Sequence, residues 1–185
     1  IVKDGKVVSN RGYGVMEEGT VKKADQYTLF AIASNTKAFV STSLGMLQSD
    51  GLLNLNDRVR KYLPGFHLYD SYVSDEVTIS DLLSHRVGLG TFSGDVIWYK
   101  TNLTSEQVVD RIRYLPKQFS FRNGYGYSNV MYTAAGEVIK KVTGEPWSAF
   151  VKKRIFAPLE MTRTFTSVND LERNHQTILI YQSPG

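Results

Sequence analysis

The chain has 185 residues, of which 42% are hydrophobic and 22% charged, and its formal net charge is +4. This is the composition of a globular protein that is long enough to bury a core. Because the chain contains no cysteine, disulfides and thiolate metal sites are excluded.

The basic residues occur in short groups that acids and apolar positions separate, such as Lys22-Lys23 and Lys152-Lys153-Arg154. A nucleic-acid-binding surface needs basic residues gathered on one face. We therefore expect a solvated surface and no nucleic-acid partner. No apolar run approaches the roughly 20 residues of a membrane-spanning helix.

The N-terminal segment has the pattern of an antiparallel hairpin. Short β-branched runs at Ile1-Val2 and Val7-Val8 flank an Asp4-Gly5 turn, and residues 11–15 are expected to continue the second strand. The first residues already have the pattern of a β-strand, and there is no initiator Met. We therefore expect a fragment or a processed form, from which an export signal can have been lost.

A long helix is predicted to begin near Ser34 and to end before Gly51, a residue suited to a left-handed cap. Lys37 is the only charged residue between Asp25 and Asp50. A helix that is apolar nearly all round is typically buried. We expect this helix to run through the middle of the molecule, with Lys37 buried along it.

Several shorter helices follow. Capping boxes at Thr78-x-x-Asp81 and Thr104-x-x-Gln107 predict two of them. Apolar residues at helical spacing over 130–142 predict a third, and Pro146 suits the start of a fourth. An irregular tail is expected from about Met161. Because strands and helices do not alternate as βαβ units, we expect no parallel sheet.

Ser34 and Lys37 are the first candidates for catalysis. They lie three residues apart, so both side chains share one helix face. Burial of a lone lysine favours its neutral amine, which is a general base, and a serine becomes a nucleophile when a neighbour takes its proton. For most Ser-x-x-Lys runs the favoured interpretation is a serine cap and a lysine that reaches water, so this pair needs independent support.

That support comes from Gly124-Tyr125-Gly126-Tyr127-Ser128-Asn129, which precedes a predicted helix. Alternate residues of an extended segment point the same way, so Tyr127 and Asn129 are expected to face one site. A phenol can relay a proton, and an amide can bind a substrate carbonyl or orient a lysine. Taken alone, Asn129 is an ordinary helix cap and Tyr127 a packed aromatic residue.

Together, Ser34-x-x-Lys37 and Tyr127-x-Asn129 resemble the motifs of the penicillin-recognising serine hydrolases. The Tyr-x-Asn form is similar to the class C β-lactamase branch, whose relatives include D,D-peptidases, D-aminopeptidases and esterases. The flanking runs match as well: FAIASNTK over 30–37, LLSHRVGL over 82–89 and IFAPLEMT over 155–162.

The resemblance implies an α+β fold of the β-lactamase/transpeptidase type, in which an antiparallel sheet flanked by helices meets a mostly helical lobe. Residues 1–185 are expected to form one incomplete domain, with a sheet-and-central-helix lobe over roughly 1–60 and a mostly helical lobe over roughly 61–160. By resemblance Ser34 is acylated, Lys37 takes its proton, Tyr127 shuttles protons and Asn129 contacts the substrate or Lys37. The Ser34 N–H would form half of the oxyanion hole.

The family's third motif, Lys-Thr-Gly or His-x-Gly on a late strand, is absent. The runs Lys141-Val142-Thr143-Gly144 and His85-Arg86-Val87-Gly88 each have one residue too many. We expect the segment that carries this motif, and the second oxyanion N–H, to lie outside the 185 residues. A natural and inactive remnant is the alternative.

The remaining candidates are weaker. His67, His85 and His175 have no spacing typical of a metal site or a triad, and His85 matches a structural position of the family. Trp98 and Tyr99 lie in a loop expected over 91–101. Packing at the surface or within the lobe is the favoured role for them, and lining a substrate cleft is the alternative. No metal or organic cofactor is implied.

The resemblance favours a serine hydrolase that forms an acyl-enzyme with a small-molecule or short-peptide substrate. A β-lactam, a D-amino-acid peptide and an ester all remain open, with a preference for peptidase or esterase activity. One alternative is a penicillin-binding sensor that stays acylated, and another is a remnant that binds without turnover. A periplasmic, cell-envelope or secreted location is expected, and the oligomeric state is left open.

Overall fold

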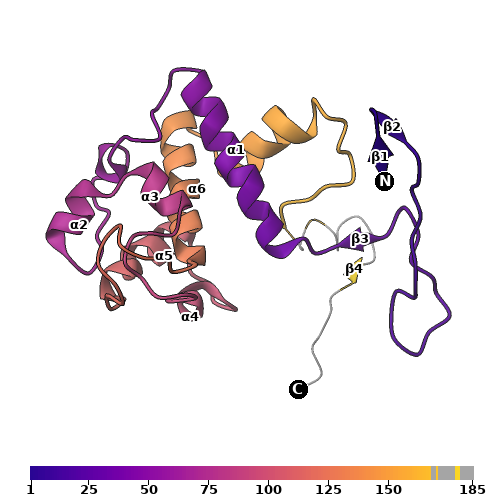
Figure 1. The fold of residues 1–185 in the computed structure, drawn as a ribbon, viewed down its shortest axis with the longest axis horizontal. Helices are drawn as coiled ribbons and strands as arrows, with labels where there is room; N and C mark the ends of the chain where they lie inside the picture. The colour runs from indigo at the N-terminus through magenta and orange to yellow at the C-terminus, as the bar shows by residue number, and fades with distance from the viewer. Residues whose placement is uncertain (168–169, 171–177, 180–185) are drawn as a thin grey trace. The chain divides into compact units, whose positions relative to one another are not determined.

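The computed structural model describes residues 1–167, 170 and 178–179 (Figure 1). The chain forms two compact units. The first comprises Ile1–Ala33 with Met161–Gly185, and the second comprises Ser34–Glu160. The lobes predicted over 1–60 and 61–160 divide the chain at a different point, because the long helix α1 packs on helices of the second unit.

The predicted N-terminal hairpin is confirmed. Strands β1 (Val2–Lys3) and β2 (Lys6–Val7) pair antiparallel, with Val2 opposite Val7. Asp4 and Gly5 both have positive φ, at 51° and 71°, as a two-residue turn between twisted strands requires. The expected continuation over 11–15 is wrong: β2 ends at Val7, and in that stretch only Val15 forms an isolated bridge, with Lys23.

A second pair of strands corrects the expectation that no strands pair in parallel. Strand β3 (Leu29–Phe30) pairs parallel with β4 (Ile178–Leu179). The missing βαβ alternation excludes parallel strands joined by a short crossover. It does not exclude this pair, because most of the chain lies between β3 and β4.

Helix α1 (Thr36–Ser49) begins and ends where the sequence predicts, and Gly51 has φ +72° just beyond its end. The expected burial on all sides is wrong. Within the described residues one face is buried, comprising Val40, Ser43, Leu44 and Leu47. The reason is that α1 contacts α6 and α7, which cover one side of it, whereas sequence hydrophobicity does not reveal which sides have partners.

The other helices are shorter, apart from α6. Both predicted capping boxes are formed, at Thr78 with Asp81 and at Thr104 with Gln107. One short helix, α4, lies in the stretch over 91–101 that is expected to be a loop, and α2 lies in a stretch for which no element is predicted. The α-helices after α1 are α2 (Ser71–Glu76), α3 (Ile79–Leu83), α4 (Asp95–Trp98), α5 (Ser105–Arg111), α6 (Asn129–Thr143) and α7 (Trp147–Val151).

Tighter or wider helical turns extend several of these elements. The 3-10 turns span Ala33–Asn35, Val59–Lys61 and Ile112–Tyr114, and a π-helical segment spans Lys152–Phe156. The first of them leads into α1 and carries Ser34.

Helix α6 is the centre of the second unit. It contacts α1, α3, α4, α5 and α7 (Figure 1). Its buried apolar residues are Val130, Met131, Ala134, Ala135, Val138 and Ile139. Because this helix is fixed by packing along its length, the residue at its N-terminus, Asn129, is held in a defined place. The architecture is α+β, as predicted.

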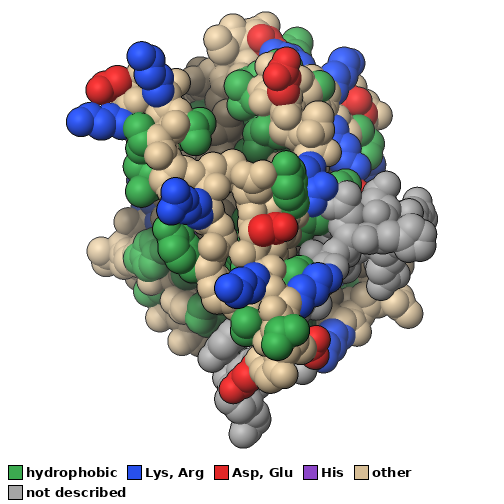
Figure 2. Space-filling model, turned by 90° about the vertical axis from the view of Figure 1, so that its right-hand side faces the viewer, with side chains coloured by type: hydrophobic (Ala, Val, Ile, Leu, Met, Phe, Trp, Pro, Cys, Tyr) green, Lys and Arg blue, Asp and Glu red, His purple; other side chains and the backbone are tan. Residues whose placement is uncertain are grey.

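On the face drawn in Figure 2, Lys and Arg side chains are scattered, and Asp and Glu side chains lie among them. In the described part of the chain, no helix combines the length and the apolar character that crossing a membrane requires.

Candidate active site

The start of α1 brings Ser34 and Lys37 together. The Lys37 ammonium donates a hydrogen bond to Ser34 Oγ at 3.2 Å. Ser34 is exposed in the 3-10 turn that precedes α1. Ala33, just before it, has φ +43°, a left-handed conformation that is strained for a residue with a Cβ and that occurs preferentially at functional sites.

Lys37 is only half-buried. The expectation that apolar side chains enclose it is therefore wrong. Lys37 Nζ donates to Asn129 Oδ1 at 2.6 Å. The same Nζ lies 4.5 Å from the ring centroid of Tyr127 and 5.4 Å from that of Tyr132, within the range of cation–π attraction. One amide oxygen and two aromatic faces therefore hold this side chain beside Ser34.

The glycine-rich turn before α6 allows two backbone segments to touch. A Cβ on Gly126 would lie 1.8 Å from the backbone oxygen of Leu89, so only glycine fits. The Gly126 N–H donates to the His85 carbonyl at 2.9 Å, and the Tyr127 carbonyl accepts from the Phe92 N–H at 2.8 Å. These contacts fix the extended segment that carries Tyr127 toward Lys37.

Hydrogen bonding with Lys37, and next with Ser34, lowers the pKa of the Tyr127 phenol, while burial opposes the shift. The Tyr127 ring packs on His85 at a centroid distance of 4.6 Å and edge-on against Phe92 at 5.7 Å. The structure thus brings all four predicted site residues, Ser34, Lys37, Tyr127 and Asn129, into one cluster within the second unit.

Asp95 belongs to this cluster, and the sequence analysis missed it. Its carboxylate accepts two hydrogen bonds from Asn129 Nδ2, at 3.1 and 2.9 Å. Trp98 Nε1 also donates to Asp95, at 3.2 Å, and both Trp98 and Tyr99 are exposed. The residues around position 95 carry no spacing signal that links them to Asn129, because the contact joins a short helix to a distant helix start.

His85 is a supporting residue of the cluster. It is buried, and its Nδ1 accepts from the Ser128 N–H at 3.0 Å. Burial, and then the charge of Lys37, lower the pKa of His85, which favours the neutral ring that this bond needs. His67 is exposed beside Arg60, and His175 lies outside the described residues.

The Lys141–Gly144 run ends a helix, as the sequence indicates. Lys141 and Thr143 belong to the last turn of α6, and Gly144 has φ +76° at its cap. Among the described residues, no group of three His, Asp or Glu side chains is arranged to hold a metal ion.

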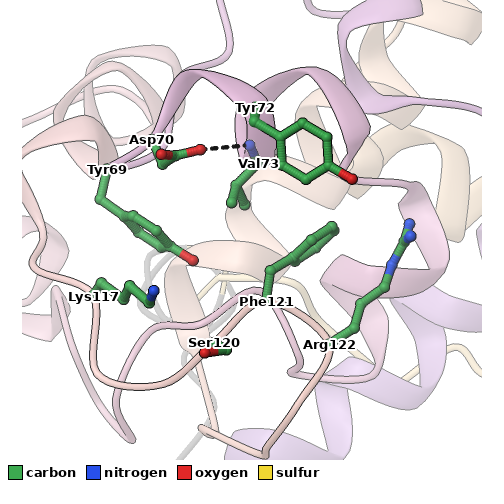
Figure 3. A pocket seen from close by; sticks show the side chains of 8 residues that line it. All are labelled: Tyr69, Asp70, Tyr72, Val73, Lys117, Ser120, Phe121 and Arg122. Atoms are coloured by element: carbon green, nitrogen blue, oxygen red, sulfur yellow. Dashed lines mark hydrogen bonds between the residues drawn. The ribbon is translucent and has the colours of Figure 1, made fainter.

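A pocket of about 540 Å³ lies elsewhere in the second unit (Figure 3). Its Asp70 caps α2 by accepting from the Val73 N–H at 2.9 Å. None of the four predicted site residues lines it. The lining residues are Tyr69, Asp70, Tyr72, Val73, Lys117, Ser120, Phe121 and Arg122.

Comparison with known proteins identifies the family. A model of the Beta-lactamase family matches residues 1–185. Protein flp of Staphylococcus aureus (strain MRSA252) is 33% identical over 184 residues, which covers 96% of this chain and 36% of that protein.

Two solved structures share the fold. The octameric penicillin-binding protein homologue from Pyrococcus abyssi superposes with a TM-score of 0.79 at 25% identity, covering 96% of this chain and 42% of that one. The D-amino acid amidase from Ochrobactrum anthropi SV3, complexed with D-phenylalanine, gives a TM-score of 0.68 at 31% identity, covering 80% and 41%. The chain thus spans about two fifths of these relatives.

Proposed function

The chain belongs to the beta-lactamase family, and from this we propose that it is a serine hydrolase that cleaves an amide or ester through an acyl-enzyme on Ser34. One observation carries the proposal: Lys37 Nζ lies 3.2 Å from Ser34 Oγ, and Asn129 Oδ1 holds it there at 2.6 Å. A nucleophile and a base within hydrogen-bond reach, with the base oriented by a third group, is the arrangement that nucleophilic catalysis requires.

In the proposed reaction, Lys37 takes the Ser34 hydroxyl proton while Oγ forms a bond to the substrate carbonyl carbon. The tetrahedral intermediate then collapses, and the bond to the leaving group breaks. The departing amine or alcohol receives a proton by way of Tyr127. Water hydrolyses the Ser34 ester in the second half of the reaction, releasing the acid and restoring the hydroxyl.

The lowered pKa of Tyr127 supports its part in this scheme, because a proton shuttle works best when its pKa lies closer to the working pH. The start of α1 supports the oxyanion role of the Ser34 N–H, since helix N-termini stabilise negative charge.

For the substrate, we propose a small D-amino-acid amide or short D-peptide, on the basis of the similarity to the D-amino acid amidase of Ochrobactrum anthropi. A β-lactam or a simple ester is the alternative. We also propose a periplasmic, cell-envelope or secreted location. The oligomeric state is left open, since one relative is octameric.

The test is covalent labelling. The protein is incubated with a labelled penicillin and with a fluorophosphonate, and the site of added mass is read by peptide mass spectrometry. Ser34→Ala should abolish the adduct, whereas Ser49→Ala, at the exposed end of α1, should leave it unchanged. Equal labelling of wild type and Ser34→Ala would contradict the assignment.

Turnover separates the proposal from its alternatives. Release of ammonia from D-phenylalanine amide, or of product from a β-lactam or an ester, identifies a hydrolase and its substrate. A stoichiometric adduct without turnover identifies a binding module. The absence of any adduct identifies a non-catalytic remnant.

A further inference from the structure

The side-chain amide of Asn129 lies between two groups of opposite charge. Its oxygen accepts from the Lys37 ammonium at 2.6 Å. Its nitrogen donates to both carboxylate oxygens of Asp95, at 3.1 and 2.9 Å. An amide has one accepting end and one donating end, and here each end meets the partner that suits it.

Only one orientation of this amide satisfies both neighbours. Turning it by 180° would place the NH2 group against an ammonium, which has only donors, and the oxygen against a carboxylate, which when ionised has only acceptors. Charge-assisted hydrogen bonds are roughly twice as strong as neutral ones. Asp95 therefore sets the direction in which the Asn129 oxygen points.

Asp95 is itself fixed by the chain around it. Gly94, with φ +87°, precedes it, and a Cβ at Gly94 would lie 2.7 Å from Leu115 Cδ1 and 3.3 Å from Val130 Cγ1. This close approach holds the start of α4 against the start of α6. Trp98, one turn later on α4, donates to the same carboxylate at 3.2 Å.

We propose that Asp95 is a positioning residue of the site: by holding the Asn129 amide, it keeps the Lys37 amine in line with the Ser34 hydroxyl. Asp95 does not touch the reacting atoms. This inference rests on the proposed function for its effect on rate, although the orientation of Asn129 is measurable without any reaction.

The rate test compares three variants with the wild type, each as the full chain. Asp95→Ala removes both acceptors and should slow the acylation of Ser34 by a fluorophosphonate about 10²-fold, the effect of a small misplacement of reacting groups. Asp95→Asn retains one acceptor oxygen and should recover a substantial part of this loss. Asp110→Ala, on α5 in an exposed ion pair with Arg113, is the matched control and should label at the wild-type rate.

A double-variant cycle tests whether Asp95 acts through Asn129. In an Asn129→Ala background, Asp95→Ala should change the rate less than 2-fold, because the amide that it orients is gone. If the double variant instead loses rate by the product of the two single-variant losses, the proposal is overturned. A wild-type acylation rate in Asp95→Ala would overturn it as well. Thermal unfolding of each variant separates these outcomes from misfolding.

The orientation itself is read from the ¹H–¹⁵N spectrum. The side-chain NH2 pair of Asn129, assigned by its loss in Asn129→Ala, should shift strongly in Asp95→Ala and not in Asp110→Ala. An unmoved pair would overturn the proposal whether or not the protein is a hydrolase. Conversely, suppose that the wild type forms no adduct but that its Asn129 NH2 pair does shift on Asp95→Ala. That result would contradict the proposed function and leave the positioning role of Asp95 standing.

Discussion

The Nδ1 atom of His85 accepts a hydrogen bond from the backbone N–H of Ser128 at 3.0 Å, and both residues are buried. Ser128 sits between Tyr127 and Asn129, so this bond holds the middle of the predicted motif. His85 also packs its ring on Tyr127 and lies 5.4 Å, centroid to centroid, from Tyr132.

The lowered pKa of His85 predicts a loss of stability in mild acid. Because the folded protein has a lower His85 pKa than the ordinary 6.5, the unfolded chain binds the proton more readily. The free energy of unfolding should therefore fall as pH drops below about 6.5 toward the folded pKa. Urea unfolding over this range measures it.

His85→Asn is the matched variant, because asparagine supplies an acceptor oxygen and tolerates the φ of +59° at this position. It should remove the pH dependence in this window while retaining most of the stability. His85→Leu leaves the Ser128 N–H unpaired and should cost about 1–3 kcal/mol. An unchanged slope in His85→Asn would contradict this account.

Asp81 is fully buried and is expected to be a major contributor to stability. It accepts from Thr78, Arg86 and Arg122, at 2.9, 2.6 and 2.8 Å. The side chains of Arg86 and Arg122 are 43% and 42% exposed, so water can hydrate them when Asp81 is replaced. Asp81→Asn should therefore lower the free energy of unfolding by about 2 kcal/mol, less than the loss of a fully buried ion pair would. Asp110→Asn, in an exposed ion pair, should change stability by under about 0.5 kcal/mol.

Burial raises the pKa of Asp81, but hydrogen bonds from Arg122, Thr78 and Arg86 outweigh it, so the net shift is downward. The stability that Asp81 contributes is therefore present above its ordinary pKa of 3.8 and is lost as pH falls through the lower, folded value. Acid unfolding of the wild type and of Asp81→Asn should converge below that point. Parallel curves would refute the assignment.

Gly126→Ala should destabilise the protein and weaken labelling at Ser34. The added methyl group would meet the Leu89 oxygen at 1.8 Å, and because that atom is backbone, the extended segment before α6 must move. We expect a loss of at least about 1–3 kcal/mol, measured by thermal unfolding. Gly136→Ala, inside α6 with nothing within 4 Å, should instead stabilise by about 0.5–1 kcal/mol.

Lys37→Met keeps the apolar stem of the side chain and removes the amine. If Lys37 takes the Ser34 proton, acylation by a fluorophosphonate should slow about 10²–10⁴-fold, the usual contribution of a general base. The rate of mass gain at Ser34 measures it, with Lys61→Met as the control, since Lys61 pairs with Asp57 instead. A retained rate would place the base elsewhere.

The sequence by itself determined the features that depend on neighbours along the chain. The turn at Asp4-Gly5, the two capping boxes and the ends of α1 and α6 follow from backbone preferences that act within a few residues. The contact of Ser34 with Lys37 also belongs here, since a helical turn brings residues three apart together.

The tertiary structure alone decided the rest. It placed Asp95 on Asn129, left one face of α1 uncovered among the described residues, and paired β3 with β4. No periodicity encodes such contacts, because each depends on how separate elements pack and on which backbone segments a glycine such as Gly126 allows to touch. The Tyr127-x-Asn129 motif therefore predicted which side chains lie beside Lys37. Packing between helices decided that Asp95 orients Asn129.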